Sequence, residues 1–279
     1  MPRWAVATCL TRRACGPRLG SLARAAARVA GRVACRDASS GNASRGRAGS
    51  PTRRSPTRFS PARAKAIALN RELVGATSLP QILDLVASRS HEMDAIAEAT
   101  AMSRLCKANE RARMSGEALE RDADVQTLLA RVEQRALSDG FGARALGNVA
   151  HALAKMGLGT GPRSRTVWRL LAQRAEQRID MFHEQGLANT AWAFATARRD
   201  APALFGAIAH TAEQRVLDFN SQGLANMAWA YATAGYAAPE LFDAIARTAE
   251  QRVGDFNSQN LANTAWAFAT AGYAAPELF

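Results

Sequence analysis

Three segments of the chain carry asparagine, tryptophan and threonine at one spacing, and the sets recur every 37 residues. An aromatic ring can stack on an unpaired base and an amide can hydrogen-bond to its edge, so one set per repeat has the chemistry to read single-stranded RNA. In a structural alternative, the tryptophan fills the gap to the next repeat and the asparagine bonds a free backbone group. The sets are Asn189, Trp192 and Thr196; Asn226, Trp229 and Thr233; Asn263, Trp266 and Thr270; and a variant, Asn148, His151 and Lys155.

A second recurring set is the triplet Glu-Gln-Arg, at residues 133–135, 176–178, 213–215 and 250–252. On a helix its glutamine points away from the core, and its glutamate and arginine lie on opposite flanks. This favours a ladder of ion pairs between the glutamate of one repeat and the arginine of the next, each worth about 0–1 kcal/mol when exposed. The alternative is a track for RNA phosphates. Its candidate residues are Arg135, Arg178, Arg215 and Arg252 with Gln177, Gln214 and Gln251.

The sequence contains no recurring pattern of an enzyme. Its four histidines occupy unrelated positions in the repeats, and it has no glycine-rich phosphate loop. Three of the four cysteines precede residue 36, and Cys106 has no cysteine or histidine at the spacing of a zinc site. We therefore predict no catalytic residue, no cofactor and no metal.

Pairs of helices must position the recurring residues. In residues 239–253, PELFDAIARTAEQRV has an apolar stripe with a period near 3.6 and a proline in its first turn, which predicts an amphipathic helix. LANTAWAFATA, at 261–271, is apolar nearly all round and must be covered on more than one side. Such units bury their apolar faces only by stacking. The predicted fold is all-α, an α-solenoid of stacked two-helix repeats of about 37 residues.

The repeat array is expected over residues 66–279. In the last full unit, Asn257 or Ser258 should cap the second helix and Gly272 should end it. A polar connector at 110–124 should follow the opening unit. Because the chain breaks off inside another unit, we expect further repeats or a further domain beyond it. The predicted units are a divergent one at 77–109, four at about 125–162, 163–200, 201–237 and 238–274, and the start of another at 275–279.

The N-terminal segment is strongly basic. Residues 1–65 carry fifteen bases and one acid, whereas the array carries 21 bases and 23 acids, so the overall charge of +12 gives the array no general attraction for RNA. Within 1–36, arginines every four residues face an apolar stripe, as is typical of an organellar targeting peptide. Residues 37–65, rich in Ser, Pro and Arg, predict a disordered linker. We expect the mitochondrial matrix, with the plastid stroma as the alternative, and no membrane insertion.

The stretch FNSQGLANMAWAYATAGY, followed by APELFDAIA, resembles the helical repeats of organellar RNA-metabolism proteins. The similar families are the octotricopeptide and heptatricopeptide repeats, the leucine-rich region of FAST-kinase-like proteins, and the helical domain of the RNA-editing substrate-binding complex, subunit six type. The resemblance covers roughly residues 77–279. It implies organellar RNA binding in transcript processing, stability or translation, without enzymatic activity in the repeats. Many members end in a RAP domain, which this sequence lacks, and that puts a processing activity in doubt.

The sequence therefore leaves two functions open. The first is non-enzymatic binding of single-stranded organellar RNA, together with other proteins of a ribonucleoprotein assembly. The second is a protein–protein interaction scaffold of the same fold. Charge placement separates them, because an RNA-binding protein needs its bases gathered along one face.

Overall fold

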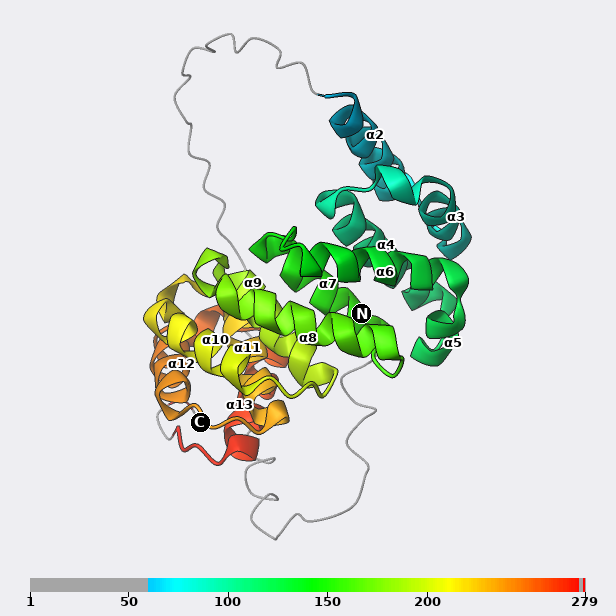
Figure 1. The fold of residues 1–279 in the computed structure, drawn as a ribbon. Helices are drawn as coiled ribbons and strands as arrows, with labels where there is room; N and C mark the ends of the chain where they lie inside the picture. The colour runs from blue at the N-terminus through cyan, green and yellow to red at the C-terminus, as the bar shows by residue number, and fades with distance from the viewer. Residues whose placement is uncertain (1–59, 276–277, 279) are drawn as a thin grey trace, which may run out of the picture.

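The computed structural model describes residues 60–275 and 278, and every regular element in this part of the chain is a helix. The helices follow one another from α2 to α13 in a single curved array (Figure 1). The predicted all-α solenoid is confirmed. No helix of the described residues is long and apolar enough to cross a bilayer. The predicted targeting peptide, most of the predicted linker and most of the segment 275–279 lie outside the described residues.

The array has two layers, and in each layer every helix packs on the next. The first-helix layer consists of α3 (Leu79–Arg89), α6 (Ala123–Leu137), α8 (Pro162–Gln177), α10 (Pro202–Gln214) and α12 (Pro239–Gln251). The second-helix layer consists of α2 (Pro61–Gly75), α4 (Ala95–Ala112), α7 (Ala143–Met156), α9 (Glu184–Thr196), α11 (Ser221–Ala234) and α13 (Ser258–Ala271). Short 3-10 helices follow four of the first helices: η2 (Ser90–Glu92), η3 (Ile179–Met181), η4 (Val216–Asp218) and η5 (Val253–Asp255).

The boundaries of the last unit follow from its capping residues. Pro239 occupies the first turn of α12, where its missing N–H costs nothing. Asn257, rather than Ser258, caps α13, and its side-chain oxygen accepts a 2.8 Å hydrogen bond from the backbone N–H of Asn260. Gly272 ends α13 in the left-handed conformation at φ 76°. The sequence predicted Pro239 and Gly272 in these places, and it gave Asn257 as one of two candidate caps.

Small and large residues divide the packing of the second-helix layer. Ala225 and Ala228 of α11 are fully buried, and α11 packs between α9 and α13. On the side toward the first-helix layer, Tyr231 packs edge-on against Phe205 of α10, with ring centroids 5.2 Å apart. The alanines let neighbouring second helices approach closely, while the aromatic residues fill the space between the layers.

Two segments that the sequence analysis assigned to irregular chain are helical. The predicted linker ended at residue 65, but Ser60 caps α2 and Pro61 begins it, because Leu69 and Leu73 become fully buried in the array. The predicted connector 110–124 contains the last turn of α4 and a short helix, α5 (Gly116–Arg121). The array therefore begins at residue 61 rather than 66, and α2 is a helix before the first predicted unit, since it packs on α4 as a second helix would.

Helix α5 supplies the carboxylate that holds the long turn before α8. Glu120 accepts hydrogen bonds from the backbone N–H groups of Gly159 (2.6 Å), Thr160 (3.1 Å) and Gly161 (2.5 Å), and from the Thr160 hydroxyl (2.7 Å). Partial burial acts to raise the pKa of Glu120, but the bonds from Thr160, Gly159 and Gly161 outweigh it, and the pKa lies below its usual value. The turn that breaks the 37-residue spacing is thus fixed by a residue of another helix.

We expect the Glu120 contacts to make stability depend on pH. Because folding lowers the pKa of Glu120, its contribution is complete above the pKa of the unfolded chain and is lost as the pH falls through the folded value. Glu120→Gln should reduce the free energy of unfolding by about 2 kcal/mol at pH 7 and by much less near pH 3. Urea denaturation at both pH values measures this. Glu117→Gln, on the exposed side of α5, is the control, and an equal loss in both variants would contradict the assignment.

Candidate nucleic-acid interface

The second helices share one partly exposed surface, which we call the polar face. It is made by the residues 2, 6, 9 and 13 positions after each N-cap residue, so that one stripe runs along each helix. Its four rows cross α4, α7, α9, α11 and α13. They are Ile96, Arg144, Gln185, Gln222 and Gln259; Thr100, Asn148, Asn189, Asn226 and Asn263; Ser103, His151, Trp192, Trp229 and Trp266; and Lys107, Lys155, Thr196, Thr233 and Thr270.

The polar face lies on the side of the second helices away from the first-helix layer. In α11, Tyr231 packs on Phe205 of α10, and Trp229 is two residues earlier. Because successive helical residues are about 100° apart, Trp229 lies on nearly the opposite side of the helix. The structure thus brings the predicted Asn, Trp and Thr sets onto one surface.

The aromatic members of the polar face form a continuous row. The ring centroids of Trp192 and Trp229 are 6.4 Å apart, as are those of Trp229 and Trp266, and both pairs are stacked at about 30°. His151 extends the row with a ring 4.9 Å from that of Trp192. Burial, and then the charge of Lys155, lower the pKa of His151, so the row begins with a neutral imidazole. The rings pack on their neighbours, as the structural alternative expects, and they also keep an exposed part, so base stacking by the tryptophans stays a prediction.

The asparagine row keeps its amides free. Asn189, Asn226 and Asn263 are half-buried, and none of their side chains makes a hydrogen bond to any residue that the structure describes. The predicted structural role, in which the asparagine bonds a backbone group, is therefore not seen at these positions. Each amide offers two donors and an acceptor beside a tryptophan, which suits the edge of a base.

The polar face carries few charges. Across α9, α11 and α13 its members are glutamine, asparagine, tryptophan and threonine. Its cations are Lys107, Arg144 and Lys155, on α4 and α7, and Lys155 is paired with Glu110. The structure does not gather the 21 bases of the array along this face, so charge placement taken alone favours the scaffold function over RNA binding.

The triplet arginines connect each unit to the preceding one. Arg135, Arg215 and Arg252 each donate a hydrogen bond to the backbone oxygen of the residue that precedes the N-cap of the second helix one unit earlier. These bonds reach Met93 (3.2 Å), Phe182 (2.7 Å) and Phe219 (2.9 Å). Arg178 instead binds the Asp139 carboxylate through two nitrogens, at 2.5 and 2.7 Å. All four side chains are about 30% exposed, and their guanidinium groups have partners within the protein.

The predicted Glu–Arg ladder of the triplets is wrong in its partners. Among the described residues, Glu176, Glu213 and Glu250 form no ion pair, and Glu133 pairs with Arg163, which belongs to no triplet. The arginines reach back to turn carbonyls and other acids, because the stacking places each C-terminal arginine over the preceding turn. The triplet glutamines are exposed at the ends of the first helices, where Gln177 bonds Arg174 and Gln214 bonds His210.

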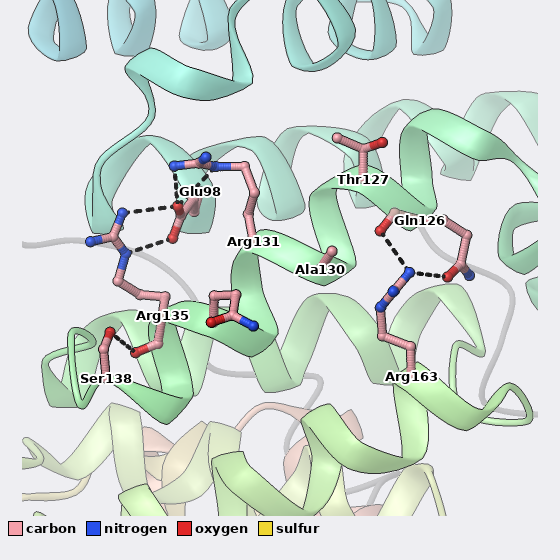
Figure 2. A pocket seen from close by; sticks show the side chains of 9 residues that line it. Glu98, Gln126, Thr127, Ala130, Arg131, Arg135, Ser138 and Arg163 are labelled. Carbon is pink, nitrogen blue, oxygen red and sulfur yellow. Dashed lines mark hydrogen bonds and ion pairs between the residues drawn. The ribbon is translucent and has the colours of Figure 1, made fainter.

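A groove of about 670 Å³ lies beside α6 and contains one of the arginine connections (Figure 2). Glu98 of α4 is 1% exposed and accepts hydrogen bonds from Arg131 (3.2 Å) and Arg135 (2.9 and 3.0 Å). Figure 2 shows the two guanidinium groups converging on this carboxylate. Glu98 balances only one of the two guanidinium charges, so the groove is cationic, but both groups are held within the protein by Glu98 and by the Met93 oxygen.

The row of glutamines on the polar face was not predicted from the sequence. Gln185, Gln222 and Gln259 are exposed and lie one helical turn before the asparagines. Their signal is their spacing, since each stands four residues before an asparagine in the same recurring segment. Glu98 was also missed, because a single acid in an alanine-rich helix gives no pattern in the sequence.

These features define a helical-repeat protein of the α-solenoid class that presents a polar and aromatic surface on its second helices. The chain belongs to the RNA-editing substrate-binding complex 6 protein family, whose model matches residues 127–279. This is one of the families that the recurring segments resemble. A comparison with curated proteins finds no match to this chain. Among the described residues, no group of three His, Cys, Asp or Glu side chains could hold a metal ion.

Proposed function

We propose that this chain binds single-stranded RNA through its polar face, as a non-enzymatic member of a ribonucleoprotein assembly. The observation that carries the proposal is the row of unpaired amides at Asn189, Asn226 and Asn263, each beside a member of the stacked tryptophan row. The family name refers to the binding of RNA-editing substrates, which supports RNA as the ligand. We further propose a mitochondrial location, with a plastid as the alternative, from the basic amphipathic segment within residues 1–36.

The physical basis is stacking and amide hydrogen bonding, with a smaller contribution from phosphates. Base–aromatic stacking contributes about 1–3 kcal/mol per base, and the uncharged part of the face, on α9, α11 and α13, adds little counterion release. Because α9, α11 and α13 present the same Gln, Asn, Trp and Thr side chains, they should prefer the same base. A run of one nucleotide is the expected target.

Fluorescence polarisation of the full chain with short RNA homopolymers tests this proposal. Contacts of the arginines in residues 1–65 to phosphates would be the same for every RNA, so only the repeats can distinguish the homopolymers. We expect one homopolymer to bind about tenfold more tightly than the others, at both low and moderate salt. Equal affinities for all of them would mean that the polar face reads no base.

A protein-binding role is favoured by a different observation. Exposed apolar side chains recur where the chain passes from the first layer to the second, one in each of the four units that follow the opening one. They are Leu137, Met181, Leu217 and Val253, with exposures of 49, 76, 70 and 43%. Such an edge suits contact with other proteins of the assembly. If no RNA binds at any salt concentration, this scaffold function is the one that remains.

A further inference from the structure

One junction in the array differs from its counterparts, and it forms a basic cleft of about 370 Å³ between α8 and α10. We call it the junction cleft. Its charged lining residues are Arg165, Arg169, Arg198, Arg199, Glu176 and Asp200. Four guanidinium groups face two carboxylates there, so the cleft carries a net positive charge.

The internal repeats show that this charge is specific to one unit. After α11 and α13 the chain continues as Gly-Tyr-Ala, at 235–237 and 272–274, but after α9 it continues as Arg-Arg-Asp, at 198–200. Gly235 and Gly272 adopt a left-handed backbone at φ 73° and 76°, and Arg198 adopts the same backbone at φ 51°. Glycine occupies this conformation freely, whereas a residue with a Cβ does so at a cost. An arginine is thus held where the fold itself favours glycine.

The next residue, Arg199, also makes different contacts from Tyr236 and Tyr273, its counterparts in the following units. At the other two junctions the tyrosine hydroxyl accepts a hydrogen bond from the backbone N–H at the start of its own unit, Tyr236 from Ala201 and Tyr273 from Ala238. Arg199 instead lies 5.8 Å over the Trp168 ring and donates to the Gly159 oxygen at 2.8 Å. A Cβ on Gly159 would stand 1.9 Å from the Arg199 Nη2 atom, so this approach needs glycine.

Several polar groups of the junction cleft have no partner. The Nε atom of Arg199 is buried and makes no hydrogen bond. Arg169 and Arg198 are exposed, and neither guanidinium group forms a hydrogen bond or an ion pair with any residue that the structure describes. Burial lowers the pKa of Arg199, and the charge of Arg165 lowers it further while Glu120 acts in the opposite sense. An anion in the cleft would relieve both the missing hydrogen bond and the repulsion between the arginines.

We propose that the junction cleft binds a phosphate group of the RNA, with Arg169 and Arg198 as its primary contacts. The inference rests on the proposed function. Arginine forks match the paired oxygens of a phosphate, and RNA supplies one phosphate per nucleotide. The cleft lies on the side of α9 that faces the first-helix layer, and the polar face lies on the other side, so a strand that contacts both passes around the C-terminal end of α9, where Thr196 is two residues before Arg198. There the cleft would hold a phosphate of the strand while the polar face contacts its bases.

Arg198→Gly is the decisive variant, because it restores the residue that the other two junctions carry and should not impair folding. We expect RNA affinity of the full chain to fall about tenfold, and the slope of log K against log salt to become shallower by about 0.7. Arg169→Ala should give a similar loss from a different element. Arg247→Ala, an exposed arginine of α12, removes the same charge elsewhere and is the matched control.

The outcomes separate this inference from the proposed function. If wild-type protein binds RNA and Arg198→Gly behaves like Arg247→Ala in both affinity and salt slope, the cleft binds no phosphate and the polar face is unaffected. If wild-type protein binds no RNA, the proposed function fails and the cleft assignment fails with it. Thermal unfolding of Arg198→Gly at or above the wild-type temperature would show that a loss of affinity is not a loss of fold.

Discussion

Phe205→Ala should lower the free energy of unfolding by about 3–5 kcal/mol, the largest stability effect that we expect from a single substitution. The Phe205 side chain is 1% exposed, edge-on to Tyr231 and stacked on Tyr236 at 4.3 Å between centroids. The backbone oxygen of the same residue accepts the Tyr231 hydroxyl hydrogen at 2.5 Å. Removing the ring leaves a cavity between the two layers, at a helix with neighbours on both sides.

Loss of the Phe205 ring should destabilise more than one unit, because each repeat is stabilised mainly by its neighbours. Urea denaturation followed by circular dichroism should show an earlier transition, in which the units after α10 unfold separately from those before it. Met181→Ala is the control, since that side chain is 76% exposed and its loss should cost less than about 0.5 kcal/mol. A loss of under about 1 kcal/mol in Phe205→Ala would contradict the packing described here.

Replacing both Trp192 and Trp229 by alanine should weaken RNA binding by about thirtyfold or more, the largest functional effect that we expect. The two rings are neighbours in the stacked row and belong to the two helices at its centre. Their loss removes two stacking surfaces next to Asn189 and Asn226. Polarisation titrations with the preferred homopolymer measure the effect, and the phenylalanine double variant should retain much of the affinity.

Arg215→Ala distinguishes the polar face from a phosphate track along the triplets. Its guanidinium group binds the Phe182 oxygen at 2.7 Å and Glu184 at 3.4 Å, so its loss should reduce stability by about 1–2 kcal/mol. We expect RNA affinity to change less than about threefold, because this group has its partners within the protein. Equal losses of affinity in Arg215→Ala and in the double tryptophan variant would support the phosphate track instead.

The start, cap and end of a helix could be predicted from the sequence where residues close together along the chain determine them. The capping by Asn257, the left-handed ending at Gly272 and the proline at the start of α12 depend on residues within one turn. The boundary at α2 was less readable, because Ser60 and Pro61 stand in a Ser/Pro/Arg-rich stretch and only the burial of Leu69 and Leu73 makes the segment helical. Helix α5 was not predicted because residues far away in the sequence stabilise it: Glu120 of α5 contacts a turn 39 residues later.

The sequence by itself determined the 37-residue period, the pairing of helices and the alignment of Asn, Trp and Thr in successive units, because a repeated pattern implies a repeated unit that must stack. Only the tertiary structure decided which partner each side chain has. It turned the triplet arginines toward carbonyls of the preceding unit, left the asparagine amides unpaired and brought Arg165, Arg169 and Arg198 together around one cleft. These outcomes depend on distances between helices in different units, which spacing along a single chain does not specify.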